Sequence, residues 1–151
     1  MAAGRNHTIV LTSEGSAHTF GSNKYGRTGH GIIEGKQTTP RKVEGCLEGK
    51  TVVNIAAGLC HTACIDEDGE TYTWGKGEYG RLGHGDEVDR SSPKVVNGLI
   101  GKKCSAVACG GMHTLVIAEN GTVYSFGCGM YDQLGRGDPS SHLSSFRGEV
   151  Y

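Results

Sequence analysis

One motif recurs three times along the chain in a shared register, and this repeat constrains the fold more than any other feature. A His-Thr pair begins at His7, His61 and His113, so successive copies lie 54 and 52 residues apart. Two series of glycines and one of tyrosines keep the same register: Gly15, Gly69, Gly121; Gly21, Gly75, Gly127; and Tyr25, Tyr79, Tyr131. Repeats of this length are typical of folds that stack one supersecondary unit on the next, because each unit buries its apolar face only against a neighbour.

Each unit has the pattern of short strands. In the third unit, residues 113–127, two apolar runs flank Asn120-Gly121, a pair that favours a tight hairpin because both residues tolerate a positive φ. Glu14-Gly15 and Asp68-Gly69 take the same place in the other units. The acidic residues 66–68 are accordingly interpreted as a solvated hairpin tip. No segment shows a sustained helical period.

Two further extended pieces complete a unit. The run before the hairpin, at 51–58 and 104–111, ends in small residues, which suit a crowded position near an axis. The run after the glycine-rich loop, at 39–43 and 92–96, contains a proline, which cannot donate to a strand ladder and is expected at a sheet edge. Glycine makes up 26 of 151 residues. This share, about 17% against a usual share of about 7%, fits a chain with many tight turns.

Four extended pieces in roughly 50 residues are typical of a propeller blade. We therefore predict an all-β fold, a partial β-propeller of about three blades with four antiparallel strands each, incomplete at both ends. The chain would form a single domain, 1–151, with units at about 1–50, 51–103 and 104–151.

Charge and hydropathy restrict the function class and the compartment. The net charge is −1 from 15 basic and 16 acidic residues, without a basic block, which argues against direct binding of nucleic acid. No apolar stretch is long enough to span a membrane. No secretory signal follows Met1, so we expect a cytoplasmic or nuclear protein that is not secreted. The six cysteines are then expected to be reduced thiols.

The segment from Gly75 to Gly80 matches G-x-G-x-x-G, a spacing typical of loops that bind phosphates. Such a site needs a helix after the loop, but the residues that follow are rich in glycine and turn formers. The equivalent segments 21–26 and 127–132 lack the second or the third glycine. We interpret the segment as a strand-exit turn and expect no nucleotide cofactor.

The repeated histidines and the cysteines are weak candidates for a metal or catalytic site. His7, His61 and His113 lie in separate blades, so they cannot converge on one ion and are interpreted as structural residues that bond a neighbouring blade. Cys60 and Cys64 are too extended along a strand for one tetrahedral site. We expect no catalytic, metal-binding or cofactor-binding residue, and therefore no enzyme. The repeated glycines are likewise interpreted as structural.

The loops after each hairpin should lie together on one rim of the propeller segment. Each presents a tyrosine, an arginine or glutamine, and a histidine or arginine, and tyrosine and arginine are common anchors of protein interfaces. The candidate partner-binding residues are Tyr25, Arg27, His30, Glu78, Tyr79, Arg81, His84, Asp86, Tyr131, Gln133, Arg136 and Asp138. Packing of the tyrosines under their own loops remains the alternative.

The unit resembles the repeat of the regulator of chromosome condensation family. The resemblance rests on Ala56-Ala57-Gly58, His61-Thr62, Tyr72-x-Trp74-Gly75, Gly80-x-Leu82-Gly83-x-Gly85 and a later Pro93-x-x-Val96, and it covers nearly the whole chain. It implies a seven-bladed propeller built from repeats of this length. The founding member is a guanine-nucleotide exchange factor for the small GTPase Ran and docks on chromatin. Relatives carry the propeller as an interaction module beside a ubiquitin-ligase or kinase domain.

The chain departs from the family pattern in three ways. It has about three units instead of seven, its first unit lacks the run that precedes Ala2, and its third unit has Ser145 where the others have a proline. Neither end shows a polar cap. We therefore expect a fragment of a larger propeller, a truncated gene product, or a chain that completes itself by self-association through open blade edges.

Three functions follow in order of support. The first is a non-enzymatic interaction module for a protein partner, such as a small GTPase or a ubiquitin-pathway component, as the interaction domain of a ubiquitin ligase or kinase would be. The second is guanine-nucleotide exchange, which the resemblance implies, although the connections 31–50 and 85–102 show no inserted hairpin of the kind that wedges at the GTPase. The third, a nucleotide- or metal-dependent enzyme, has the least support.

Overall fold

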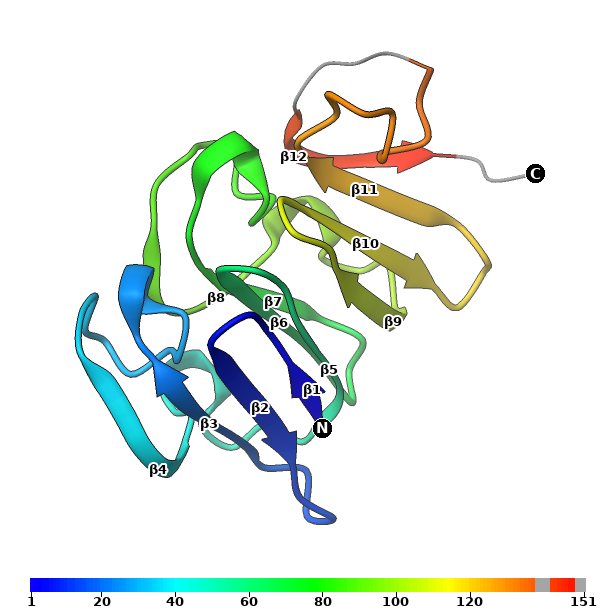
Figure 1. The fold of residues 1–151 in the computed structure, drawn as a ribbon. Helices are drawn as coiled ribbons and strands as arrows, with labels where there is room; N and C mark the ends of the chain where they lie inside the picture. Colours follow the sequence, from blue (N-terminus) through cyan, green and yellow to red (C-terminus); the bar gives the residue numbers. More distant parts are fainter. Residues whose placement is uncertain (138–141, 149–151) are drawn as a thin grey trace.

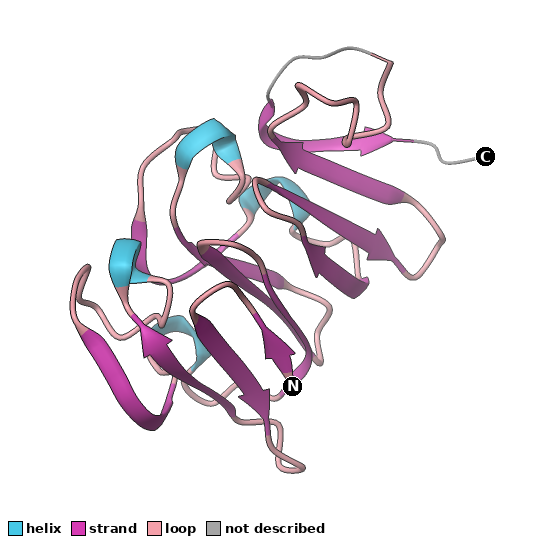
Figure 2. Cartoon of the chain, viewed as in Figure 1, coloured by secondary structure: helices cyan, strands magenta, loops and turns pink. Residues whose placement is uncertain are grey.

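A computed structural model describes residues 1–137 and 142–148, and over these residues the chain consists of three four-stranded antiparallel sheets in succession. Figure 1 shows the sheets side by side, each turned relative to the one before, like the blades of a propeller. The described part contains short 3-10 turns, which Figure 2 draws in cyan, and no α-helix. It holds no helix long and apolar enough to cross a membrane.

The strands of each sheet follow one another in chain order. The first sheet holds β1 (Ala2–Ala3), β2 (His7–Leu11), β3 (Ala17–Ser22) and β4 (Lys36–Lys42). The second holds β5 (Val52–Ala57), β6 (His61–Asp66), β7 (Thr71–Gly75) and β8 (Arg90–Val95). The third holds β9 (Cys104–Cys109), β10 (His113–Ala118), β11 (Val123–Gly127) and β12 (His142–Gly148). The predicted all-β propeller blades are confirmed.

The short turns occupy equivalent places in the first two sheets. Two of them, η1 (Lys24–Gly26) and η3 (Glu78–Gly80), follow the third strand of the sheet, and the other two, η2 (Gly45–Leu47) and η4 (Asn97–Leu99), follow the fourth. The proline-containing strands β4 and β8 lie at sheet edges, as their missing amide donors predict.

The hairpin register is the same in all three sheets. His7 pairs with Gly21, His61 with Gly75, and His113 with Gly127. These three glycines have φ of 110°, 105° and 115°. A Cβ atom there would lie 2.7, 2.8 and 2.7 Å from the Cα atom of the paired histidine, so a close backbone approach explains why glycine recurs at this position.

The apolar core lies between the sheets. At the first junction, between β1–β4 and β5–β8, Ile9, Val52, Tyr72 and Trp74 belong to one buried cluster. At the second junction, between β5–β8 and β9–β12, Ile65, Leu99, Val116 and Phe126 belong to another. Because the middle sheet packs on both sides, every residue of β6 and β7 is buried. The small-residue strands β1, β5 and β9 pack beside one another along the inner side.

The prediction of a solvated tip at residues 66–68 is wrong for Asp66, which is buried. Its carboxylate accepts hydrogen bonds from the backbone amides of Asp68 and Glu70, at 3.1 and 2.9 Å, and from the Tyr72 hydroxyl, at 3.0 Å. The Lys50 ammonium lies 3.3 Å away. Sequence order alone hid the contact with Lys50, which comes from the segment before β5, whereas Tyr72 lies in β7, the second strand of the same hairpin.

Candidate partner-binding rim

The loops at residues 23–35, 77–89 and 128–137, called the rim loops below, each follow the third strand of their sheet; Figure 1 shows them in blue at the left, in green at the upper left and in orange at the upper right. The backbone is unusual in two of them, because Tyr25 and Tyr79 have φ of 66° and 62°. Few bulky residues adopt this left-handed conformation, which carries local strain. In the third rim loop Asp132, with φ of 56°, takes the left-handed position instead of the tyrosine before it.

The Tyr25 ring lies among cations from two sheets. The Lys24 and Lys76 ammonium groups lie 5.1 and 4.8 Å from the ring centroid, and the Arg27 guanidinium lies 5.9 Å away. Such distances permit cation–π attraction. Lys76 directly precedes the second rim loop and also pairs with Glu78 of that loop. The tyrosine therefore holds neighbouring rim loops together while part of its surface stays open.

Arg27 and Arg81, two of the predicted partner-binding residues, are buried. Each donates from Nε to a carbonyl of its own loop, Lys24 or Glu78, at 2.9 Å. Each also donates from Nη1 across a junction, Arg27 to the Leu59 carbonyl at 3.4 Å and Arg81 to the Gly111 carbonyl at 3.2 Å. Their guanidinium groups thus serve the packing of the blades, and the exposed surface of the rim comes from other residues.

His7 and His61, two of the three histidines predicted to be structural, each take part in a relay of hydrogen bonds across a junction. At the first junction the Thr62 hydroxyl donates to the Arg27 carbonyl at 2.7 Å, so it must accept from Nε2 of His7, at 2.8 Å. At the second, Thr114 donates to the Arg81 carbonyl at 2.7 Å and accepts from Nε2 of His61 at 2.9 Å.

Both relay histidines are kept neutral. The relay places the hydrogen on Nε2 and leaves Nδ1 of each ring buried without a partner. Burial, with the charge of Arg27 next, lowers the pKa of His7 to about 4. Burial, with Arg81 and the neighbouring histidines next, lowers the pKa of His61 to about 3. Neither ring is placed for acid–base chemistry on a ligand.

His30 and His84 occupy equivalent places in the first two sheets, and each bonds a threonine of the third strand of its own sheet. Thr19 donates to the Thr28 carbonyl at 2.5 Å and lies 3.0 Å from Nε2 of His30. Thr73 and His84 repeat this arrangement, with a distance of 3.0 Å between Oγ1 and Nε2. Burial, followed by nearby cations, lowers the pKa of both histidines, that of His84 to about 4.

In the third sheet, Arg136 and Ser125 take the places of the histidine and the threonine in the bond between rim loop and third strand. Arg136 donates from Nε to the Ser125 hydroxyl at 3.3 Å, and Ser125 donates to the Leu134 carbonyl at 2.9 Å. Gln133 accepts from the Tyr131 amide at 2.7 Å. Asp138 lies outside the described residues.

Apolar side chains supply much of the exposed rim. Tyr131 is 79% exposed, and sequence reasoning missed its companions Ile32, Ile33, Val88 and Met130, each more than half exposed. Their signal was present, since an Ile-Ile pair within a glycine-rich loop has no strand to bury it. Among the polar candidates, Glu78 pairs with Arg81 at 3.3 Å, and Asp86 pairs with Arg90 at 2.6 Å.

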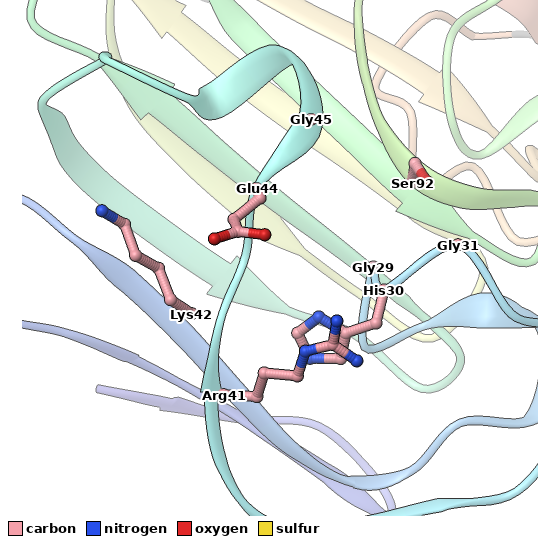
Figure 3. Close-up of a pocket in the computed structure, with 8 residues that line it drawn as sticks. All are labelled: Gly29, His30, Gly31, Arg41, Lys42, Glu44, Gly45 and Ser92. Carbon is pink, nitrogen blue, oxygen red and sulfur yellow. The ribbon is translucent and has the colours of Figure 1, made fainter.

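A pocket of about 200 Å³ opens beside the first rim loop, shown in Figure 3. Its lining comes from three segments: Gly29, His30, Gly31; Arg41, Lys42, Glu44, Gly45; and Ser92. Within the described residues no group of three or more His, Cys, Asp or Glu side chains is arranged to hold a metal ion, and the six cysteines are free thiols.

Two family models, both described as the regulator of chromosome condensation (RCC1) repeat, match the chain. One covers residues 68–117, and the other covers 1–27, 52–81 and 104–133. The matched segments contain both relay histidines, His7 and His61, and the short turns η1 and η3 of the first two rim loops.

Similar proteins carry much longer chains. The ultraviolet-B receptor UVR8 of Arabidopsis thaliana is 41% identical over 95% of this chain and 32% of its own length. The human E3 ubiquitin-protein ligase HERC2 is 43% identical over 89% of this chain and 3% of its own. The chain therefore spans about a third or less of these relatives.

Solved structures agree with the fold. Human WBSCR16 superposes with a TM-score of 0.86 and 26% identity, over 96% of this chain and 36% of that chain. Prp20p from Saccharomyces cerevisiae, described with its binding properties to Gsp1p and histones, gives a TM-score of 0.86 and 25% identity over 98% and 37%.

Proposed function

Because the chain belongs to the regulator of chromosome condensation (RCC1) repeat family, we propose that it is a non-enzymatic protein-interaction module that docks its partner on the rim. The observation that carries this proposal is the exposed apolar and aromatic surface of the rim loops, where Tyr131, Ile32 and Ile33 are more than half exposed. Exposed apolar groups rimmed by charge are typical of protein-binding surfaces.

The partner class is drawn from similar proteins. Prp20p is described as binding Gsp1p and histones, and HERC2 is a ubiquitin-protein ligase. We propose a small GTPase or a ubiquitin-pathway component as the partner, in the cytoplasm or nucleus. Contacts from Tyr25, Tyr79, Glu78 and Asp86 would surround the apolar residues.

The test compares a change on the rim with a surface change away from it in a co-precipitation experiment. The rim variant carries Ile33→Ser with Tyr131→Ser, and the control carries Val53→Ser, which is 50% exposed. Val53 follows Val52, which pairs with Asp66 at the hairpin end of its sheet, away from the rim. A protein retained by the unmodified chain and the control but lost by the rim variant supports the proposal. Retention by the rim variant, or loss by both variants, contradicts it.

Guanine-nucleotide exchange is the second candidate, supported by the family resemblance and by the likeness to Prp20p. It is tested by release of a fluorescent guanine nucleotide from a small GTPase in the presence of the chain. Accelerated release would replace the non-enzymatic proposal. Release at the spontaneous rate would exclude exchange on that GTPase.

We also propose self-association through the lateral blade faces. A groove of about 160 Å³ on the third sheet is lined by apolar residues, among them Val107, Leu115 and Val123. At both junctions the equivalent faces are covered by a neighbouring sheet. Solution mass tests this directly: a multiple of 15.9 kDa supports self-association, and a monomer at every concentration contradicts it.

A further inference from the structure

The face of the third sheet that points away from the second, called its outer face below, is less covered than the same face of the middle sheet. Leu115 and Ile117 take the places that Ala63 and Ile65 hold in β6. Ala63 and Ile65 are fully buried, Ile65 in the cluster shared with the third sheet, whereas Ile117 is 42% exposed. With Val123, Leu115 and Ile117 line the apolar groove of about 160 Å³. The groove therefore corresponds to a face that a neighbouring sheet buries elsewhere in the chain.

The third sheet also repeats the groups with which each earlier sheet holds the next. His113 stands at the place of the relay histidines, and its ring has no hydrogen-bond partner within the described part of the chain. Gly135 stands at the place of Gly29 and Gly83 in its rim loop. A Cβ atom at Gly29 or Gly83 would lie 2.8 Å from an aromatic ring of the next sheet, but one at Gly135 would meet no described atom within 4 Å. A relay donor and a position for an aromatic ring are thus both unfilled.

The first sheet carries the groups that complete such a junction, on the face that points away from the second sheet, its own outer face. Thr8 pairs with Phe20 across the hairpin, in the register in which Thr114 pairs with Phe126 at the second junction. Thr114 and Phe126 are fully buried, whereas Thr8 and Phe20 are partly exposed. The Thr8 hydroxyl has no hydrogen-bond partner among the residues that the structure describes. One chain therefore holds both halves of a third junction on two separate sheets.

We propose that the outer face of the third sheet docks on the outer face of the first sheet of a second copy of this chain. In this head-to-tail junction, His113 Nε2 would donate to the Thr8 hydroxyl, and Thr8 would donate to the Gln133 carbonyl. Gln133 takes the place of the relay arginines, and a backbone carbonyl is present whatever the side chain. Phe20 would lie against Gly135. The proposal rests on the proposed self-association and names the two faces that meet.

Pairing of like faces leaves the relay groups unmatched. Two third-sheet faces would bring together two His113 donors without a relay threonine, and two first-sheet faces would bring together two Thr8 hydroxyls without a relay histidine. The head-to-tail contact matches donor with acceptor, because it repeats the two junctions already present within the chain. Such a contact is heterologous, so further copies add to the same two faces, in a ring or an open row.

The test uses two variants of the 151-residue chain, each with one face blocked by a charge. Phe20→Glu blocks the first-sheet face, and Ile117→Glu blocks the third-sheet face. In analytical ultracentrifugation each variant alone should be a monomer of 15.9 kDa. An equimolar mixture should form a dimer with one chain of each kind and nothing larger, because only one intact pair of faces remains.

The alternatives give different patterns. A Phe20→Glu chain that still dimerises alone would show that third-sheet faces pair with each other, and an Ile117→Glu chain that does so would show pairing elsewhere. Either result overturns the head-to-tail contact and leaves self-association standing, as does a monomeric mixture when the unmodified chain associates. An unmodified chain that is monomeric at every concentration refutes both proposals. Circular dichroism checks each fold, and Val10→Glu and Leu115→Glu replace a variant that unfolds.

Removal of one hydroxyl tests the relay across this junction. Thr8→Val in the Ile117→Glu chain leaves the His113 donor and the Gln133 carbonyl of the other chain unpaired, so it should weaken the mixed dimer about tenfold. Thr122→Val in the same chain makes the same substitution in the third-sheet hairpin, which the mixed dimer does not use, and should leave the Kd unchanged. Equal Kd values for the two variants would overturn the assigned register.

Discussion

The two junctions between sheets use the same hydrogen bonds around different apolar contents. Each has a histidine that donates to a threonine of the next sheet, and that threonine donates to an arginine carbonyl. The aromatic residue differs, however: Trp74 lies against Gly29 at the first junction, and Phe126 lies against Gly83 at the second. A Cβ at Gly29 would lie 2.8 Å from Trp74 Nε1, and one at Gly83 would lie 2.8 Å from a Phe126 ring carbon.

This difference has a consequence for the carbonyl that ends each relay. The Arg27 carbonyl accepts from Thr62 and also from Nε1 of Trp74, at 3.0 Å. The Arg81 carbonyl accepts only from Thr114 among the described contacts, because phenylalanine has no donor. The polar relay is therefore the same at both junctions, whereas the aromatic residue beside it differs. With Phe126 in place of tryptophan, the second junction lacks the second donor to the arginine carbonyl.

Acidification should have the largest effect, because it acts on both junctions. The folded pKa values of His7 and His61, about 4 and about 3, lie below the ordinary value of 6.5. As the pH falls below 6.5, the unfolded chain takes up protons that the folded chain does not. The stabilisation is therefore complete above pH 6.5 and declines through pH 4, and at the second junction on to pH 3. We expect the free energy of unfolding to fall by several kcal/mol.

Urea unfolding at pH 7 to 4, followed by the fluorescence of Trp74, the single tryptophan, measures this effect. Imidazole resonances separate the contributions, since His30 and His84 also have lowered pKa values. A free energy of unfolding that is independent of pH, or a His61 resonance that titrates near 6.5, would contradict the prediction.

Removal of the relay hydroxyl should distinguish the junctions. Thr114→Val leaves the Arg81 carbonyl and the His61 donor unpaired and should cost about 2–3 kcal/mol. Thr62→Val should cost less, about 1–2 kcal/mol, because Trp74 still donates to the Arg27 carbonyl. Denaturant unfolding of the two variants gives the comparison. Equal losses would show that the second donor does not compensate.

Trp74→Phe should make the first junction resemble the second. It removes one hydrogen bond to the Arg27 carbonyl and should lower the free energy of unfolding by about 1 kcal/mol. In this background, Thr62→Val should become as destabilising as Thr114→Val. A double-mutant cycle measures the coupling, followed by circular dichroism because the fluorophore is lost. Strict additivity would be evidence against a shared acceptor.

The smallest effect concerns the carboxylate beside Arg81. Glu78 lies 3.3 Å from Arg81 Nη2, and its side chain is 45% exposed. Glu78→Gln should therefore change the free energy of unfolding by no more than about 0.5 kcal/mol. Thermal unfolding at low and high salt measures it. A large loss would mean that the buried guanidinium depends on this charge more than on its carbonyl partners.

The blades were predictable from sequence because their causes are local. The Asn120-Gly121 turn, the proline of β8 and the glycine paired with each histidine all act within one unit. Their recurrence at one register showed that G-x-G-x-x-G is a turn, and η3 begins within that segment.

The burial of Arg27 and Arg81 was not predictable, because their partners across the junctions are backbone carbonyls of Leu59 and Gly111. Any residue carries a carbonyl, so no complementary side chain signals the contact. The pocket beside the first rim loop could not be predicted from the sequence for a similar reason. It joins segments at 29–31, 41–45 and 92, whose proximity depends on how one blade packs on the next.

The relay also sets an order for synthesis at the ribosome. His7 finds its acceptor 55 residues later, in Thr62, and His61 finds its own 53 residues later, in Thr114. At about 5–20 residues per second, each blade would wait several seconds for the strand that seals it. The junctions would thus form one after another in the order of synthesis, because each new sheet packs on the sheet made before it and completes its relay.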